Sequence, residues 1–277
     1  MSDTTYAPPQ AGADQDGRTA AHGDFIWYEL ITPDPVAAKT FYDAVVGWTI
    51  EPQPSGEMDY RMIGRADGGN AGGVMRLTDD MQSHGARPTW LGYIATDDVD
   101  QTVASIEQAG GKALLPAFDI PDIGRIAMVA DPQGAPFYAM KPTPPAGNEN
   151  AQSDVFSPDQ PGRVAWNELA TSDLAAAKQF YPEKFGWTLG DVMPMGDMGD
   201  YQFINRGDVM IGAMMTAAAG NHPRWRFYFR VADVDAAKQA VEAGGGTVLH
   251  GPQEVPGGDR VLISTDPQGA EFGVVGK

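Results

Sequence analysis

The sequence predicts an α+β protein made of two copies of one domain, and three features lead to this prediction. The first is a repeat: FIWYELITPDPVAAKTFYDAVVGWTI at residues 25–50 aligns without a gap with VAWNELATSDLAAAKQFYPEKFGWTL at residues 164–189, and thirteen of the twenty-six aligned positions are identical. The second is that strand and helix patterns follow each copy in the same order. The third is an identical DPQGA at residues 131–135 and 266–270. One long repeat indicates duplicated domains, because solenoid repeats run to about 20 to 50 residues.

The first copy of the repeat predicts a strand, a helix and the start of another strand. Trp27 and Glu29 alternate with their neighbours at the period of two that is typical of a strand. Asp34 precedes Pro35, and this order favours a helix start, because the carboxylate accepts hydrogen bonds from first-turn amides and proline has none to donate. Gly47 stands where a left-handed cap would end the helix.

The second copy predicts the same elements. Asp173 and Gly186 take the roles of helix start and helix end. Pro182 is a difference, because proline inside a helix removes one backbone hydrogen bond. We therefore expect a bend or an early stop there.

Each half of the chain is expected to hold two βαβββ units. Beyond the repeat, the pattern predicts strands at 60–65 and 71–77, a polar loop at 78–88, a strand at 89–96, a helix at about 99–109, and strands near 113, at 123–130 and at 135–140. The second half repeats this order. Residues 1–23 are expected to be a disordered tail, 24–141 the first domain, 142–162 a proline-rich linker and 163–277 the second domain.

Charge and composition exclude several classes of function. A formal net charge of −18 disfavours nucleic acid and anionic membranes as partners, because both require a basic face. The absence of cysteine excludes disulfides, thiolate metal sites and a cysteine nucleophile. At 277 residues with 42% hydrophobic residues, the chain is long enough for two cores of ordinary domain size.

Targeting signals are also absent from the sequence. No apolar run of about 18 residues is long enough to span a membrane. The first residues have neither the basic start nor the apolar core of a secretory signal. The sequence therefore predicts a cytoplasmic protein, as a monomer or a homodimer.

The motifs resemble those of the vicinal oxygen chelate superfamily, also called the glyoxalase/bleomycin-resistance/dioxygenase superfamily. The resemblance rests on a strand ending in TxD, a helix ending in FYxxxxGW, and then DVD, AGG and DPxG before a last strand. It covers about residues 24–141 and 163–276 and is strongest for the two-domain glyoxalase-like branch with WxEL on its first strand. It implies that each pair of βαβββ units forms an open, eight-stranded cup around a small-molecule site.

The resemblance also allows a test for a metal site. In metal-dependent members the ligands are His, Gln or Glu on the first strand of each unit and Glu on the last. These positions fall here on Trp27, Leu91 and Tyr138 in the first half and on Trp166, Arg226 and Gly273 in the second. None is an ordinary ligand for a divalent metal, and His22, His84, His222 and His250 share no ligand spacing. The sequence predicts no metal, and no dinucleotide or phosphate-binding motif indicates another cofactor.

Two glutamates are the candidate catalytic residues. The resemblance implies that the strand face with Trp27 and Glu29, and likewise with Trp166 and Glu168, lines each cup. A carboxylate desolvated beside an indole has a raised pKa, which suits a general acid or base near neutral pH. The structural alternative is that each glutamate pairs with an arginine or accepts backbone hydrogen bonds.

The two cups are expected to differ. Arg226, Tyr228 and Arg230 share a strand face in the second domain, so Glu168 is expected to be ion-paired. Leu91 and Tyr93 take the equivalent positions in the first domain and leave Glu29 without a nearby cation, which makes Glu29 the better catalytic candidate.

Aromatic residues and arginines are the candidate binding residues. Tyr93, with Tyr60 as an alternative, would stabilise oxygen charge during catalysis. The candidate substrate-binding residues are Trp27, Tyr60, Trp90, Arg125, Tyr138, Trp166, Tyr201, Arg226, Tyr228 and Arg260. Solvated surface charge is the alternative for Arg125 and Arg260, and core packing is expected for Trp48 and Trp187. The methionines of the second half fit either a promiscuous pocket or core filling.

Two functions from different classes follow from these residues. The first is a metal-independent glyoxalase-like enzyme that moves a proton on a small oxygenated molecule, in a lyase, isomerase or cyclase type of reaction. The second is a binding protein of the bleomycin-resistance type that sequesters its ligand unchanged. A further alternative is that one domain is active and the other is a scaffold.

Overall fold

A computed structural model of the 277-residue chain describes residues 22–54, 56, 58–148 and 151–277. The predicted N-terminal tail therefore lies outside the described residues, except for its last two. These two belong to the fold: His22 hydrogen-bonds to the Lys184 carbonyl oxygen, and Gly23 N donates to Ala95 O. No helix among the described residues is long and apolar enough to cross a membrane.

The first half of the chain forms one eight-stranded mixed sheet. Its strands are β1 (Phe25–Thr32), β2 (Thr49–Ile50), β3 (Tyr60–Gly64), β4 (Asn70–Arg76), β5 (Thr89–Ala95), β6 (Lys112–Ile120), β7 (Gly124–Ala130) and β8 (Pro136–Pro142). They are ordered β2-β3-β4-β1-β5-β8-β7-β6. The two βαβββ units therefore join through the antiparallel pair β1 and β5 at the centre of the sheet.

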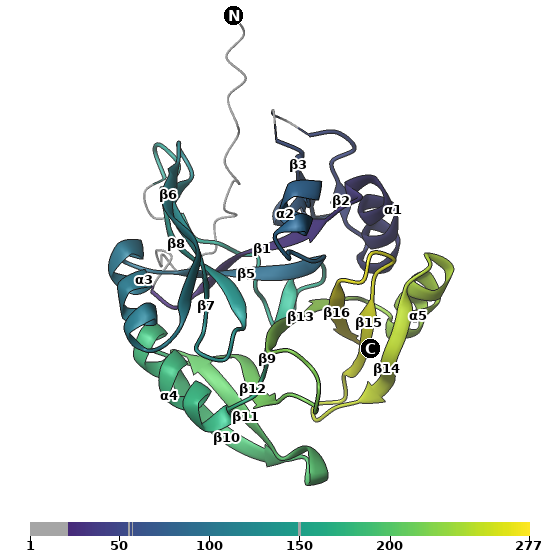
Figure 1. The fold of residues 1–277 in the computed structure, drawn as a ribbon. Coiled ribbons are helices and arrows are strands. Elements are labelled where there is room, and N and C mark those ends of the chain that lie inside the picture. The colour runs from purple at the N-terminus through teal and green to yellow at the C-terminus, as the bar shows by residue number, and fades with distance from the viewer. Residues whose placement is uncertain (1–21, 55, 57, 149–150) are drawn as a thin grey trace, which may run out of the picture.

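The second half forms an equivalent sheet. Its strands are β9 (Val164–Thr171), β10 (Thr188–Pro194), β11 (Asp200–Arg206), β12 (Val209–Thr216), β13 (Arg224–Arg230), β14 (Thr247–Glu254), β15 (Arg260–Thr265) and β16 (Glu271–Gly276). The order is β10-β11-β12-β9-β13-β16-β15-β14. This α+β architecture with two open eight-stranded sheets confirms the predicted fold class (Figure 1).

The helices follow the predicted start and stop signals. They are α1 (Pro35–Val46), α2 (Asp79–Ser83), α3 (Val99–Gln108), α4 (Leu174–Phe185) and α5 (Val234–Ala243), with a short 3₁₀ turn η1 (Gly196–Met198). Asp34 caps α1 by accepting from Val36 N and Ala37 N, and Gly47 ends it in a left-handed conformation.

The structure differs from two local expectations. Of the bend or early stop expected at Pro182, the early stop does not occur: α4 continues to Phe185, because proline removes one backbone hydrogen bond while Tyr181 and Phe185 on its two sides are fully buried. The loop expected at 78–88 contains α2, which Thr78 caps by accepting from Met81 N.

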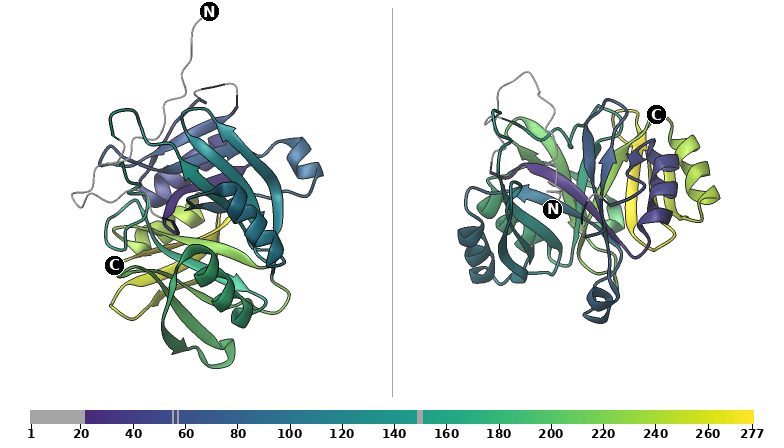
Figure 2. Two further views of the ribbon diagram at one scale, coloured as in Figure 1. Left: turned by 90° about the vertical axis from the view of Figure 1, so that its left-hand side faces the viewer. Right: turned by 90° about the horizontal axis from the view of Figure 1, so that it is seen from above.

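The sheets lie back to back, and each cup opens away from the other (Figure 1). Helix α1 lies beside α5 on one side and α3 beside α4 on the other, as the views in Figure 2 also show. Each domain thus shares a helix layer with its partner.

The duplicated motifs meet across this interface in symmetric pairs. Tyr42 Oη donates to Asp266 Oδ2 over 3.1 Å, and Tyr181 Oη donates to Asp131 Oδ2 over 3.0 Å. Trp90 and Trp225 donate to these tyrosines, and Trp48 and Trp187 donate to Gly162 O and Gly23 O of the opposite half. The expected core role of Trp48 and Trp187 is confirmed.

One apolar cluster runs through both domains, where two separate cores were expected. It includes Phe25 and Tyr28 of β1, whose rings pack on Phe227 of β13. The predicted linker joins this packing: Val155 is buried, and Asp154 accepts hydrogen bonds from Arg163 and Arg65. The two halves therefore share one hydrophobic core.

Candidate active site

The strand register brings the candidate residues of the first cup onto one face. Directly paired residues on neighbouring strands point to the same side of a sheet. Trp27 pairs with Tyr93, and Tyr93 with Tyr138, while Glu29 lies between Leu91 on β5 and Gly73 on β4. Alternation along β1 then turns Tyr28 to the opposite face, against the second domain.

Four aromatic side chains enclose the Glu29 carboxyl group. Tyr93 Oη donates to Glu29 Oε2 over 2.9 Å, and Tyr138 stacks on Tyr93 with ring centroids 4.3 Å apart. Trp27 Nε1 donates to Tyr60 Oη over 2.8 Å. Glu29 is 2% exposed, and its Oε1 has no hydrogen-bond partner within the described part of the chain. This is a buried carboxyl group with one oxygen available to a ligand.

The environment raises the pKa of Glu29 to about 7. Desolvation by burial is the largest cause, and the hydroxyl groups of Tyr93, Tyr60 and Tyr138 oppose it. Burial also raises the pKa of Tyr93 well above its ordinary value, with the Glu29 charge as the next cause. The tyrosines therefore remain neutral donors while Glu29 titrates near neutral pH.

The second cup holds the equivalent glutamate, Glu168, beside a cation. Arg226 Nη1 forms an ion pair with Glu168 Oε1, and Tyr201 Oη donates to Glu168 Oε2 over 2.7 Å. Tyr228 also donates to this carboxylate over 3.2 Å, and Arg226 continues the ion pairs to Glu271. The expected ion pair of Glu168 is thus present. Both oxygens of Glu168 are satisfied, in contrast to Glu29.

Other equivalent positions separate the cups further. Trp166 Nε1 donates to Tyr201 Oη over 2.8 Å, as Trp27 does to Tyr60. Gly273, however, stands in the register position of Tyr138, and the Tyr228 ring lies directly over it. The second cup therefore lacks the stacked tyrosine pair of the first. Arg230 forms its ion pair with Asp259 and not with Glu168.

Three candidate binding residues lie outside the cups. Trp90 is 2% exposed and donates to Tyr42 at the domain interface, because alternation along β5 places it opposite Leu91 and Tyr93. Arg125 and Arg260 lie on the helix-bearing face of their sheets. They pair with Asp100 and Asp235 in the first turns of α3 and α5, which favours the alternative of surface charge over that of substrate ligands.

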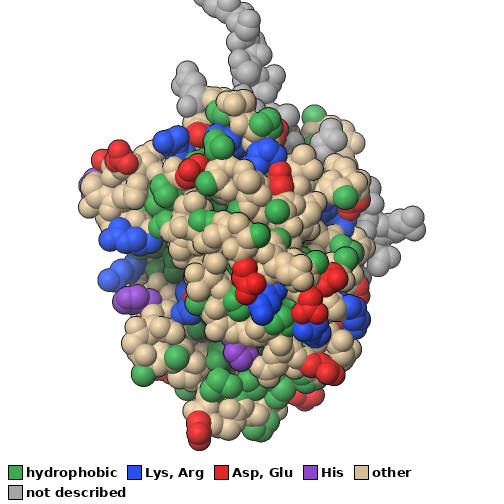
Figure 3. All heavy atoms as spheres, turned by 90° about the vertical axis from the view of Figure 1, so that its right-hand side faces the viewer, with side chains coloured by type: hydrophobic (Ala, Val, Ile, Leu, Met, Phe, Trp, Pro, Cys, Tyr) green, Lys and Arg blue, Asp and Glu red, His purple; other side chains and the backbone are tan. Residues whose placement is uncertain are grey.

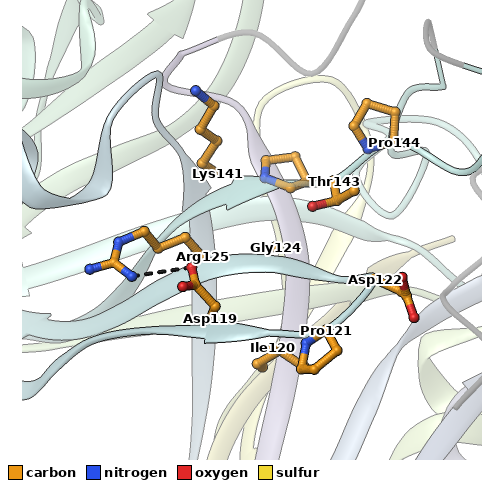
Figure 4. A pocket seen from close by; sticks show the side chains of 10 residues that line it. Asp119, Ile120, Pro121, Asp122, Gly124, Arg125, Lys141, Thr143 and Pro144 are labelled. Atoms are coloured by element: carbon orange, nitrogen blue, oxygen red, sulfur yellow. Dashed lines mark hydrogen bonds and ion pairs between the residues drawn. The ribbon is translucent and has the colours of Figure 1, made fainter.

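Basic and acidic side chains also lie next to one another on the face of the molecule shown in Figure 3. A groove of about 470 Å³ adjoins Arg125 at the end of the β6–β7 hairpin. Asp119 and Lys141 line this groove, and Asp119 pairs with Arg125 (Figure 4). It lies at the hairpin end, away from the floor residues around Glu29.

The comparison with known proteins agrees with this fold. Residues 25–137 and 162–274 match the Glyoxalase/Bleomycin resistance protein/Dioxygenase superfamily. The chain belongs to this superfamily.

Two curated relatives align with nearly the whole chain. One is "Putative glyoxylase CFP32" of Mycobacterium tuberculosis, 33% identical over 252 residues, which are 90% of this chain and 93% of that protein. Another is "Anthracycline biosynthesis protein DnrV" of Streptomyces peucetius, 32% identical over 270 residues, 92% of this chain and 94% of that protein.

A solved structure shows the same fold at low identity. The Mn(II)-bound glyoxalase from Novosphingobium aromaticivorans superposes with a TM-score of 0.61 at 17% identity, over 92% of this chain and 82% of that one. Extradiol-type dioxygenases such as LapB of Pseudomonas sp. KL28 match equally well, with a TM-score of 0.61 and 12% identity over 94% of each chain.

The residues of the first cup do not fit the metal that the superfamily fold implies. Trp27, Leu91 and Tyr138 occupy the ligand positions, and Glu29 alone offers a carboxylate. Divalent metals in such sites need about three or four converging oxygen or nitrogen ligands. Among the described residues, no group of three or more His, Asp or Glu side chains gathers in such an arrangement. We therefore derive no chemical step through a metal.

Gly73 is a site residue that the sequence reasoning missed. A Cβ atom on Gly73 would lie 2.1 Å from Tyr60 Oη and 2.3 Å from Tyr60 Cζ. A side chain at this position would therefore overlap the Tyr60 ring where it now lies; in the second cup Ala213 takes this position, and Tyr201 still donates to Glu168. The sequence contained one signal for this residue. Strand β4 has Gly72-Gly73 where the equivalent strand β12 has Gly212-Ala213, and Gly73 and Ala213 pair with Glu29 and Glu168.

Proposed function

We propose that the protein is a glyoxalase-like enzyme that moves a proton on a small oxygenated organic molecule, with Glu29 of the first cup as general base and acid. One observation carries the proposal: Glu29 is buried without a cation beside it, and its Oε1 has no partner among the described residues. A pKa near 7 allows the same carboxyl group to accept and return a proton at neutral pH.

The chemistry follows from the groups around Glu29. Glu29 Oε1 accepts a proton from a carbon next to a carbonyl group, and the electron pair moves onto the carbonyl oxygen of the ligand. Tyr93, which donates to Glu29 in the free protein, then donates to that oxygen and stabilises its charge. The proton returns to a different ligand atom, which gives an isomerase, lyase or cyclase type of outcome.

Glu168 is the weaker candidate for this role. Its carboxylate is held in the ion pair with Arg226 and by two tyrosine hydroxyls. Neither oxygen is left open to a ligand, because Oε1 and Oε2 both have partners. We assign the second domain a mainly structural part, through the shared core and the symmetric tyrosine pairs.

Deuterium exchange tests the proposal without knowledge of the substrate. A panel of enolisable ketones and aldehydes, incubated in D₂O with the full chain, should exchange the hydrogen next to the carbonyl group, as followed by NMR. Glu29→Gln should lose this exchange, while Arg260→Gln, on the far face, should keep it. Full exchange by the Gln variant would remove Glu29 from the mechanism.

A second function is favoured by the apolar wall of the cup. Leu115 and Phe118 of β6 are 43% and 42% exposed, as is suitable for holding an apolar ligand without turnover. Native mass spectrometry of gently purified protein distinguishes the two functions. An unaltered small molecule bound equally by the native protein and Glu29→Gln would support sequestration.

A further inference from the structure

We propose that the first cup selects an uncharged ligand, whose apolar body lies on the β6–β7 wall and whose hydroxyl group donates a hydrogen bond to Glu29 Oε1. This inference rests on the proposed function for the choice of cup. It goes further by assigning the charge, the polarity and the orientation of the ligand.

The wall follows from the strand register. Leu115 pairs with Met128, Met128 pairs with Tyr138, and Tyr138 pairs with Tyr93, so these side chains form one row on the cup face. Phe118 is in the next row, paired with Ile126. The row is apolar and exposed at the β6 end and carries hydroxyl groups at the floor, so it orients a ligand with its polar end toward Glu29.

The charge selection follows from what surrounds Glu29. In the register, its neighbours are Leu91 and Gly73, and the next residue of the β1 face is Trp27. The equivalent neighbour of Glu168 is Arg226, with Arg224 and Glu271 beyond it. A carboxylate or phosphate ligand in the first cup would meet the Glu29 charge with no cation from the described residues to offset it.

A cationic ligand is disfavoured for a different reason. A buried cation needs an ionised carboxylate as its partner. Glu29 titrates near neutral pH, so below that pH it offers a neutral acid, and one of its oxygens already accepts from Tyr93. A neutral hydroxyl donor suits Oε1 in either state, because a carboxyl group keeps acceptor capacity when it is protonated.

Entry to Oε1 requires one aromatic ring to turn. Trp27, Tyr93 and Tyr138 are each less than one-tenth exposed, whereas Tyr60 is partly exposed. Tyr60 packs on the backbone of Gly73 and accepts a hydrogen bond from Trp27 Nε1. Because Tyr60 is the most exposed of these four rings, we expect it to be the ring that turns when a ligand enters.

Four matched probes test the inference by calorimetry on the full chain: 2-naphthol, 2-methoxynaphthalene, 2-naphthoate and 2-naphthylmethylammonium. We expect naphthol to bind most tightly. Loss of the donor in the ether should weaken binding about three- to tenfold, the value of one hydrogen bond. Naphthoate should bind at least about tenfold more weakly than naphthol, and increasingly so as the pH rises past 7 and Glu29 ionises.

Two exposed side chains locate the binding. Phe118→Ser, on the cup wall, should weaken naphthol binding, and Leu249→Ser, a 52% exposed residue on the equivalent strand β14, should leave it unchanged. Neither change removes a buried side chain, so both variants should fold.

The inference is overturned if naphthoate or the ammonium compound binds as tightly as naphthol, or if no probe binds up to its solubility limit. It is also overturned if Leu249→Ser weakens binding as much as Phe118→Ser. Selective naphthol binding by a protein that catalyses no deuterium exchange would leave the inference standing and remove the proposed function.

Discussion

At the scale of single residues, Glu29 and Glu168 show how one substitution changes the state of a buried acid. Both stand at the same place in the repeated WxEL, and both lie beside tyrosine and tryptophan. The residue paired with each on the next strand differs: Leu91 beside Glu29 and Arg226 beside Glu168. Glu168 is thus held by an ion pair, whereas Glu29 has no cation beside it among the described residues and keeps one oxygen without a partner.

The pKa of Glu29 predicts a pH-dependent stability. The folded value of about 7 exceeds the ordinary value of 4.5, so the fold favours the neutral acid. This contribution is complete below pH 4.5 and is lost as the pH rises toward 7, at a cost of about 3 kcal/mol. Glu29→Gln avoids that cost. Urea unfolding should give equal stabilities for the two proteins near pH 5 and a more stable variant at pH 8.

The opposite sign is expected for Glu168→Gln. This change leaves the buried Arg226 with Glu271 as its remaining acid. Breaking a buried ion pair costs about 3 kcal/mol or more, and the loss should persist from pH 6 to 9. Equal effects of the two glutamine variants in the same unfolding experiment would contradict the assigned difference between the cups.

At the scale of elements, the sequence was sufficient where the signals are local. Asp34 and Gly47 fixed both ends of α1, and period-two alternation identified β1 and its two faces. Alternation along β5 also predicts that Trp90 points away from the cup, because Leu91 and Tyr93 on the same strand face it. For Arg125 the sequence left substrate binding and surface charge both open, because its partner Asp100 is distant in the chain and no local signal joins the two.

The role of Gly73 in β4 leads to a prediction about a neighbouring strand. Gly73→Ala should displace Tyr60 of β3, because the new Cβ would overlap its ring. The Tyr60 hydroxyl lowers the pKa of Glu29, so the variant should raise that pKa further. NMR titration of the Glu29 carboxyl carbon measures the shift. Ala213→Gly, the reverse change beside Glu168, is the matched control and should leave Glu29 unaffected.

At the scale of the whole molecule, the duplicated motifs hold the two domains together. DPQGA and the FY pair each occur twice in the sequence, and nothing local in either motif indicates a contact with the other. In the fold, Asp131 meets Tyr181 and Asp266 meets Tyr42, because each helix packs on the opposite domain. Contacts between distant segments of this kind need the three-dimensional arrangement, so the sequence alone left the domains separate.

The symmetric pairs predict joint unfolding. Tyr42→Phe removes the hydrogen-bond partner of the Trp90 indole and that of Asp266 Oδ2, while Asp266 Oδ1 keeps its bonds from Gln268 N and Ala270 N; the loss should cost about 2 to 4 kcal/mol. Tyr181→Phe should cost the same and the double variant the sum, because the pairs share no residue. Urea denaturation should show one transition in every case. A variant that separates it into two would contradict the shared core.

The measurement that tests the central claim most directly is the titration of Glu29 in the intact protein, followed through the ¹³C resonance of its carboxyl carbon and assigned with Glu29→Gln. The account predicts a midpoint near pH 7, well above that of an exposed glutamate. A midpoint near 4.5 would mean that Glu29 is solvated or paired, and would contradict its role as the proton-transferring group of the first cup.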